Sequence, residues 1–431
     1  MNGLKRILLL FVALALVLGT YASTGAWRSE AAAPAAHPDV DASIAFWQKR
    51  IAGNPQAYLD YTLLGQAMTR KARESGDVGY YQQAEEALQR ATAINPAYLP
   101  ALEQRAYVLF AMHDFAGALS IAGPLVENRR AVTALAIVGD AYLALGEYEQ
   151  AEAAYQALAE RGASPAVYSR QALIADLHGD PQGALALMEK AARLALESGE
   201  YGEALAWYEY QLGELHFKMG DLRRSGERYQ AALDYFEGYY LALAGLGKIA
   251  AARGDYAAAI DYYQRATQIV PQPDLLAALG DVYQSAGDAE QARLQYDTVE
   301  FIGELAEINR QVYNRQLANF YSDHDLHLEK ALQLASAELE VRRDVLGYDA
   351  AAWAYYKNGQ IPQAEAAMAQ ALRLGTRDAR LYYHAGMIAL AVGEAQKAGE
   401  FLSEALSINP YFDLLQAPLA RETLEGIGRE L

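Results

Sequence analysis

The apolar positions of this chain follow helical spacing in short runs that are separated by glycine-containing turns. In residues 275–299, two runs with steps of three and four residues each define one helix face: Leu276, Leu279 and Tyr283, then Ala292, Tyr296 and Val299. Between the runs, Gly287 suits the left-handed end of one helix and Asp288 suits the cap of the next. The pattern predicts a helical hairpin with a first and a second helix.

The hairpin pattern repeats with a nearly constant period. An alanine recurs in the second helix, with most steps 33 or 34 residues long: Ala84, Ala118, Ala151, Ala184, Ala259, Ala292, Ala331, Ala364 and Ala398. Ser225 takes the missing place in the gap after Ala184, and the step from Ala292 to Ala331 is also long. Such a fixed period predicts a repeat array.

A glycine recurs inside the first helix of many units, upstream of these alanines. Its positions are Gly65, Gly139, Gly213, Gly247, Gly280 and Gly386. A glycine inside a helix costs roughly 1 kcal/mol relative to alanine, so its recurrence indicates a structural use. We expect close backbone approach, with the small alanine of the second helix packed where the two helices cross.

This arrangement resembles the tetratricopeptide repeat family, whose pattern is W-x2-L-G-x2-Y, then A-x3-F, then P. The matching residues are Leu276, Leu279, Gly280, Tyr283, Ala292 and Tyr296, and again Tyr382, Ala385, Gly386, Ala398, Leu402 and Pro410. The resemblance covers residues 55–410 and implies an all-α, right-handed solenoid of about ten helix-turn-helix repeats. A divergent helical-repeat relative of similar period is the alternative.

The two ends of the array have their own predicted elements. Ile44, Trp47 and Ile51 lie at helical spacing and predict an N-terminal capping helix, so that the solenoid with its cap spans residues 41–410. Residues 411–431 predict a C-terminal capping helix, because each repeat buries its apolar face only against neighbours. The run around Gly303 predicts a helical extension.

The N-terminus predicts export. Lys5 and Arg6 precede an uncharged run from Ile7 to Trp27, so residues 1–27 are a signal peptide or an uncleaved signal anchor. Residues 28–40 form an Ala/Pro linker. By the positive-inside rule the body is expected outside the cytoplasmic membrane, tethered if the signal is uncleaved and secreted or periplasmic if it is cleaved, as in a bacterial exported repeat protein.

Charge and composition narrow the possible partners. The formal net charge of −18 argues against nucleic acid, because phosphate backbones require a basic footprint. The chain has no cysteine, which removes disulfides, thiolate nucleophiles, iron–sulfur clusters and a lipoprotein anchor.

A search for catalytic chemistry returns little. The chain has no nucleophile elbow, zinc-protease motif, phosphate-binding glycine loop or dinucleotide fingerprint. The one candidate metal cluster is "SDHDLH", with Asp323, His324, Asp325 and His327. It falls where a hairpin turn is expected, and turns collect such residues. We therefore predict no catalytic residue, no metal and no cofactor, and keep a metal or enzymatic site at this cluster as an alternative function.

Without catalytic motifs, the expected function is binding at the protein surface, and the family resemblance implies which surface binds. First helices of tetratricopeptide repeats line a concave groove that holds a peptide. Groove-facing positions here would be Tyr107, Phe110, Trp207, Tyr210, Glu214, Phe217, Lys248, Asp281, Trp353, Tyr356, Tyr383 and Met387. Aromatic residues recur among them and are frequent anchors of binding hot spots, although single ones could instead fill the core between repeats.

These positions predict a scaffold that binds a protein or peptide partner, and the acidic charge favours basic segments of that partner. Binding of chaperone C-termini is disfavoured, because Arg315 and Asn319 resemble a carboxylate clamp but Ala350 in the next unit does not continue it. Recognition of an envelope glycan by the tyrosines is a further alternative.

Overall fold

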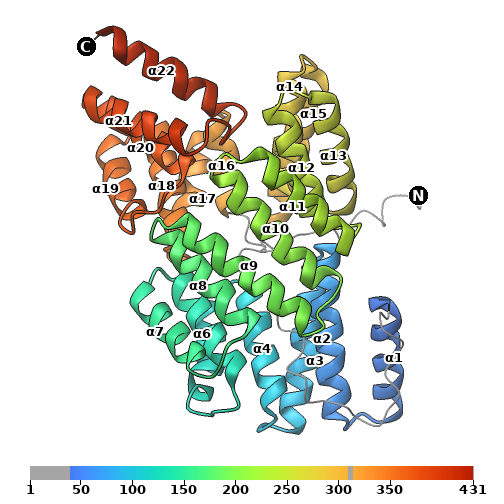
Figure 1. Cartoon of the computed structure of the whole chain (residues 1–431). Coiled ribbons are helices and arrows are strands. Elements are labelled where there is room, and N and C mark those ends of the chain that lie inside the picture. The colour runs from blue at the N-terminus through green and yellow to red at the C-terminus, as the bar shows by residue number, and fades with distance from the viewer. Residues whose placement is uncertain (1–38, 309–313, 431) are drawn as a thin grey trace. The chain divides into compact units, whose positions relative to one another are not determined.

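The computed structural model describes residues 39–308 and 314–430, and all regular structure in these ranges is helical (Figure 1). The chain divides into two compact units, Met1–Val167 and Tyr168–Leu431. The predicted signal segment and residues 28–38 of the linker lie outside the described residues. Among the described helices, none has both the length and the apolar character needed to cross a bilayer.

From residue 39 on, unit 1 consists of a single helix followed by helix pairs. Its elements are α1 (Val40–Gly53), α2 (Tyr58–Ser75), α3 (Gly79–Ile94), α4 (Leu99–Ala111), α5 (Phe115–Ala122), the short 3-10 helix η1 (Gly123–Leu125), α6 (Val132–Ala144) and α7 (Tyr148–Ala159). Helix α8 (Pro165–Leu177) contains the boundary between the units. In each pair the two helices pack on each other, and first helices also contact first helices, as α2 contacts α4 and α4 contacts α6.

Unit 2 continues the same plan. Its elements are α9 (Pro181–Glu197), α10 (Glu203–Lys218), α11 (Leu222–Tyr235), α12 (Tyr240–Ala252), α13 (Tyr256–Ile269), α14 (Pro273–Ser285), α15 (Ala289–Ile308), α16 (Asn314–Asp323), α17 (Leu328–Val341), α18 (Val345–Lys357), α19 (Ile361–Ala371), α20 (Ala379–Val392), α21 (Ala395–Ile408) and α22 (Gln416–Glu430). Within the described residues, α2 to α21 form ten successive pairs, which confirms the prediction of an all-α solenoid of about ten repeats. Helix α15 runs on to Ile308, so the extension expected around Gly303 is present.

The turns inside the pairs use the predicted glycine–aspartate punctuation. Gly287 has a φ of 84°, and the side chain of Asp288 accepts a hydrogen bond from the backbone N–H of Gln291 at 3.1 Å. The same left-handed glycine followed by a capping aspartate occurs at three further turns, at Gly179–Asp180, Gly220–Asp221 and Gly254–Asp255. The helix boundaries were therefore readable from local chemistry.

The recurring glycine of the first helix faces a ring rather than the predicted alanine. A methyl group at Gly280 would lie 2.8 Å from Cδ1 of Tyr296 and closer still to Cε1, and Tyr296 follows Ala292 by one helical turn. Gly139, Gly213 and Gly247 face Tyr155, Tyr229 and Tyr263 in the same way, while Gly65 and Gly386 face Leu88 and Leu402. The close approach was predicted correctly, but the residue that requires it is the larger one four positions after the alanine.

Candidate partner-binding face

The predicted groove residues divide into a buried half and a partly exposed half. Six are buried by the protein's own packing, namely Tyr107, Phe110, Trp207, Phe217, Trp353 and Tyr383. Six keep accessible surface, namely Tyr210, Glu214, Lys248, Asp281, Tyr356 and Met387. Both of the unit 1 residues are in the buried set, so the accessible positions all belong to unit 2.

A charged pair on α10 and α12 belongs to the accessible half of this set. Nζ of Lys248 lies 2.9 Å from both carboxylate oxygens of Glu214 and 4.1 Å from the ring centroid of Phe217. The side chains of Glu214 and Lys248 are 34% and 32% exposed, which leaves them reachable by a partner. Each follows the recurring glycine of its repeat, and Asp281 follows the glycine of the next repeat. The three residues form what we call the charged row.

Tyrosines of the second helices hold the carboxylates that follow these glycines. The hydroxyl of Tyr296 donates to Oδ1 of Asp281 at 2.8 Å, and the hydroxyl of Tyr229 donates to Glu214. In unit 1 the hydroxyl of Tyr155 donates to Oδ1 of Asp140 at 2.7 Å. The sequence placed Glu214 and Asp281 in the groove but did not predict their tyrosine partners. The signal that could have found the pairs is the acid placed 15 residues before the tyrosine in three repeats.

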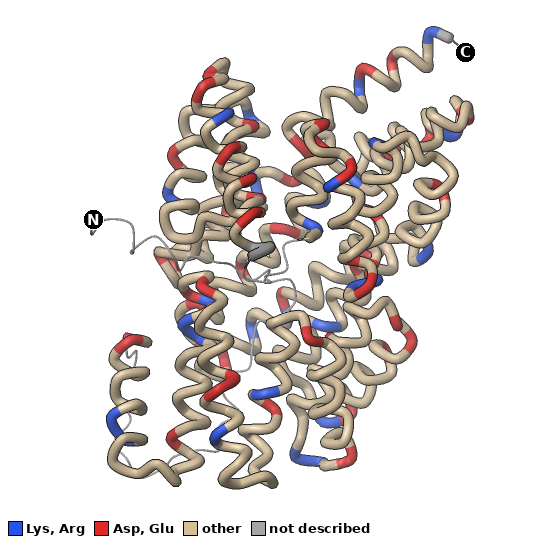
Figure 2. The backbone as a smooth tube through the Cα atoms, turned by 180° about the vertical axis from the view of Figure 1, so that it is seen from behind, with Lys and Arg blue, Asp and Glu red and all other residues tan. Residues whose placement is uncertain are grey.

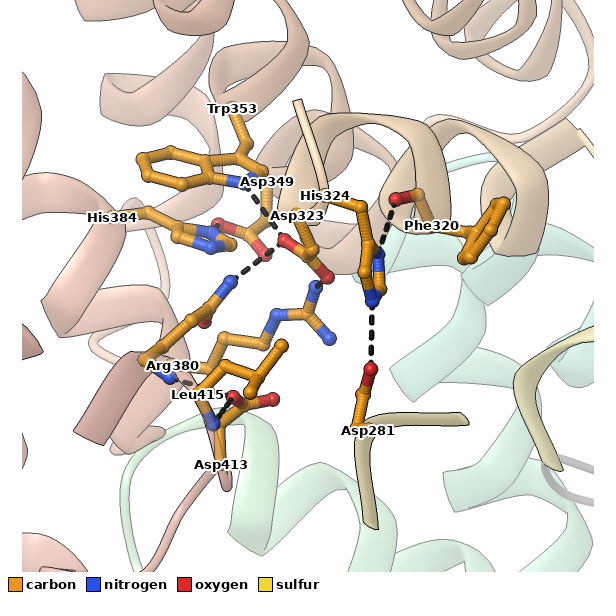
Figure 3. A network of polar contacts seen from close by, with 11 residues as sticks. Asp281, Phe320, Asp323, His324, Asp349, Trp353, Arg380, His384, Asp413 and Leu415 are labelled. Atoms are coloured by element: carbon orange, nitrogen blue, oxygen red, sulfur yellow. Dashed lines mark hydrogen bonds and ion pairs between the residues drawn. The ribbon is translucent and has the colours of Figure 1, made fainter. Parts of the chain in front are cut away.

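A second group of polar residues converges on Asp323, as Figure 3 shows. Its Oδ1 accepts hydrogen bonds from Nε1 of Trp353 at 2.8 Å and from Nε2 of Gln416 at 2.6 Å, and its Oδ2 lies 2.5 Å from the guanidinium of Arg380. The indole of Trp353 stacks on the imidazole of His384 with centroids 4.1 Å apart. We call these five residues the Asp323 cluster. Burial raises the pKa of Asp323, although the charge of Arg380 opposes the rise.

His324 extends this group toward the charged row. Its Nε2 lies 2.7 Å from Oδ1 of Asp281 and its Nδ1 lies 2.7 Å from the carbonyl oxygen of Phe320 (Figure 3). A carbonyl oxygen only accepts hydrogen bonds, so Nδ1 carries a proton, and a proton on Nε2 as well makes the ring cationic. Burial alone would lower the pKa of His324, but the hydrogen bond and the negative charge of Asp281 outweigh it and raise the pKa.

The four residues of the candidate metal cluster point to four different partners. Asp323 pairs with Arg380, His324 with Asp281, Asp325 with Lys357 and His327 with Glu300. Helix α16 ends at Asp323 and α17 begins at Leu328, so the segment is the turn that the sequence predicted. In the part of the chain that the structure describes, no group of three or more histidines and acidic residues is arranged to hold a metal ion.

The cation of the suspected carboxylate clamp is also used internally. Arg315 is buried and lies 3.2 Å from Asp344 and 3.5 Å from Glu338. Its guanidinium therefore neutralises acidic residues of its own repeat and the next rather than facing a peptide terminus.

Long-range contacts within unit 2, which the sequence did not predict, join turns and loops far apart in the chain. The side-chain amide of Asn409 donates to the carbonyl oxygen of Phe217 at 2.8 Å, and the hydroxyl of Thr376 donates to the carbonyl oxygen of Leu177 at 2.6 Å. The ring of Phe412 packs on Tyr383 with centroids 5.6 Å apart. Residues 409–416, which run from the end of α21 to the first residue of α22, are thus held against first helices of the same unit.

Charge is distributed along the helices rather than gathered in one block, as Figure 2 shows. The paired helices and this charge distribution define an all-α repeat protein whose candidate binding residues, both charged and aromatic, lie on first helices.

Models of the tetratricopeptide repeat match residues 103–166, 138–195, 210–272 and 350–411, and a further one matches residues 65–98. These matches span more than half of the chain, which belongs to the tetratricopeptide repeat family. Such repeats are protein-interaction scaffolds, which supports this general role.

Solved structures with a similar fold have low sequence identity to this chain. The yeast Tom70 structure is 13% identical, covers 91% of this chain and 92% of its own, and gives a TM-score of 0.36. A tetratricopeptide repeat protein from Parabacteroides merdae is 18% identical, with coverages of 62% and 100% and a TM-score of 0.35. TTC0263 from Thermus thermophilus is 20% identical, with coverages of 48% and 98% and a TM-score of 0.37. No curated protein matches the chain.

Proposed function

We propose that this protein is a scaffold that binds a protein or peptide partner along the charged row of unit 2, with basic side chains of the partner facing Glu214 and Asp281. The observation that carries the proposal is the row itself. Glu214 and Asp281 each accept a hydrogen bond from a tyrosine hydroxyl of a second helix, and Nζ of Lys248 lies 2.9 Å from Glu214. The ring of Tyr210 packs on Tyr229, and Tyr210 keeps accessible surface. Preorganised carboxylates of this kind lose little conformational entropy when they bind a cation.

The test uses a partner recovered with the full-length protein from the native membrane fraction, identified and then purified for titration. Glu214→Gln removes one carboxylate and should weaken binding about fivefold at low salt, with a smaller effect as salt rises. Lys248→Gln removes the cation that competes for Glu214 and should strengthen binding of a basic partner. Opposite effects of the two variants would support the proposal.

The control changes the opposite, second-helix face of a neighbouring repeat. Arg265 and Gln268 are exposed on α13, so Arg265→Ala with Gln268→Ala should leave binding unchanged. If this pair abolishes binding while Glu214→Gln and Lys248→Gln do not alter it, the partner uses the second helices and the charged row is not the site. Trp207 is not a suitable target for such a test, since it is buried and its truncation would disturb the core.

We further propose that the repeat body acts outside the cytoplasmic membrane. The support is the sequence alone: Lys5 and Arg6 before an uncharged run. A reporter that is active only in the cytoplasm, fused after Leu431, should be inactive, and a periplasmic reporter at the same point should be active. Activity of the cytoplasmic reporter would refute export.

A further inference from the structure

We propose that residues 409–416 are a built-in occupant of the first-helix face of unit 2, and that a partner segment binds there by replacing them with the same chemistry. That chemistry is an aromatic side chain followed four residues later by an uncharged carboxamide. The proposal deepens the scaffold function and rests on it, but it concerns the Asp323 cluster rather than the charged row.

Three side chains of this segment contact three different first helices. Asn409 donates to the carbonyl oxygen of Phe217 on α10, the ring of Phe412 packs on Tyr383 of α20, and Gln416 donates to Asp323 of α16. Phe217 and Tyr383 belong to the set that the family resemblance assigned to the partner groove. The protein's own chain therefore binds the backbone of one of these positions and packs on the side chain of the other.

The segment presents its side chains from irregular backbone that is preorganised at one end. The carboxylate of Asp413 accepts hydrogen bonds from the backbone N–H groups of Leu415 and Gln416, both at 2.8 Å (Figure 3). This cap starts α22 and fixes the direction from which Gln416 reaches Asp323. Phe412 and Gln416 are consequently held as a pair with defined spacing.

Only one of the two polar atoms of the Gln416 carboxamide is hydrogen-bonded, so a partner's carboxamide could replace it at Asp323. The side-chain nitrogen of Gln416 donates to Asp323, but its buried Oε1 accepts no hydrogen bond from the described residues. Leaving a buried polar atom unpaired costs free energy, so the segment binds less tightly than a fully paired carboxamide would. An unpaired buried carboxylate oxygen costs free energy, so Asp323 needs a hydrogen-bond donor in place of Gln416 when the segment leaves. A partner segment that replaces residues 409–416 must therefore supply a hydrogen-bond donor to Asp323.

The experiment uses the full-length protein and a fluorescent synthetic peptide of residues 409–421. Gln416→Glu places a second carboxylate against Asp323 and should release the segment. The apparent affinity for the peptide should then rise about tenfold or more over the wild type, because it scales with the fraction of protein whose site is free. Gln396→Glu, the same change at an exposed position of the last repeat, is the control and should bind the peptide as the wild type does.

Two further measurements make the result decisive. Hydrogen exchange in residues 409–430 should increase in Gln416→Glu and stay unchanged in α11 to α13, which shows that the rest of the unit is folded. A peptide with both Phe412→Ala and Gln416→Ala should not bind. The proposal is overturned if the segment stays protected in Gln416→Glu, if the peptide binds this variant no better than the wild type, or if the altered peptide binds equally well.

The outcome is separable from that of the scaffold test. Peptide binding that depends on Gln416→Glu but not on Glu214→Gln would establish the exchangeable segment even if no partner used the charged row.

Discussion

A methyl group added at Gly280 tests the packing on which the charged row depends. The added Cβ would lie within 3.0 Å of two ring atoms of Tyr296, whereas ordinary contacts are 3.4–4 Å, so the ring would have to move. The ring is not free to do so, because its hydroxyl is 2.8 Å from Asp281 and Asp281 is 2.7 Å from His324. Overpacking costs about 1–3 kcal/mol and the helix propensity of alanine returns up to about 1 kcal/mol, so Gly280→Ala should destabilise the protein by about 1–2 kcal/mol.

The matched control is Gly226→Ala in α11. A methyl group there would meet only the terminal methyl of Ile249 at 3.5 Å, an ordinary contact, so the gain in helix propensity of up to about 1 kcal/mol should appear as stabilisation. The pair isolates the ring contact because both changes put the same group into a helix of the same unit.

A double-mutant cycle with Tyr296→Ala identifies the clashing group. In that background the ring is absent, so Gly280→Ala should become neutral or stabilising, and the coupling free energy should be about 1–3 kcal/mol. Urea unfolding followed by far-ultraviolet circular dichroism gives the free energies, and hydrogen exchange of α14 and α15 localises the effect. The assignment of Tyr296 as the clashing group would be refuted if the Gly280→Ala protein were as stable as the Gly226→Ala protein. It would also be refuted if Gly280→Ala lowered the unfolding free energy equally with and without the tyrosine ring.

Two further changes test the polar contacts. Tyr155→Phe removes the hydroxyl that donates to the buried Asp140 and should cost about 1–3 kcal/mol in urea unfolding. Tyr142→Phe, at a partly exposed position of the same unit, should cost under about 0.5 kcal/mol, and equal costs would contradict the role of the pair. Because the pKa of folded His324 is raised, its pair with Asp281 stabilises the protein below the unfolded pKa of about 6.5, and this contribution is lost as pH rises through the folded pKa. The difference in unfolding free energy between wild type and His324→Gln should therefore be larger near pH 6 than near pH 9, while the exposed His327→Gln should show little difference at either pH.

The repeat architecture was predictable because its determinants are local. The period of the alanines, the turn glycines and the capping aspartates each act within one hairpin, and neighbouring hairpins supply the rest of the core. The turn at residues 324–327 followed from the same local signals, whereas the metal site kept as an alternative at this cluster could not be judged from the sequence, because the ion-pair partners of its four residues lie in other helices.

The exposure of the predicted groove residues was less predictable, because it depends on contacts between repeats that are distant in sequence. The first-helix positions of Trp353 and Tyr383 could be read from the repeat register, but their burial could not. It depends on Asp323, on Arg380 and on residues 409–416, which are far apart in the sequence of unit 2 and meet only in the folded protein. No periodic pattern encodes the hydrogen bond between Asn409 and the carbonyl of Phe217.

The recurring glycine links the packing of the core to the positions of the surface charges. Because the glycine has no side chain, a tyrosine ring of the second helix packs directly against the first helix. The hydroxyl of that ring donates a hydrogen bond to the acid that follows the glycine, as at Asp140, Glu214 and Asp281. In the repeat where the residue after the glycine is Lys248, its Nζ instead bonds to Glu214 of the preceding repeat. The positions of the surface charges are therefore set by the core beneath them. A substitution that loosens a tyrosine should move a carboxylate of the charged row even though it touches no partner, and binding defects from core variants of unit 2 have to be read with that in view.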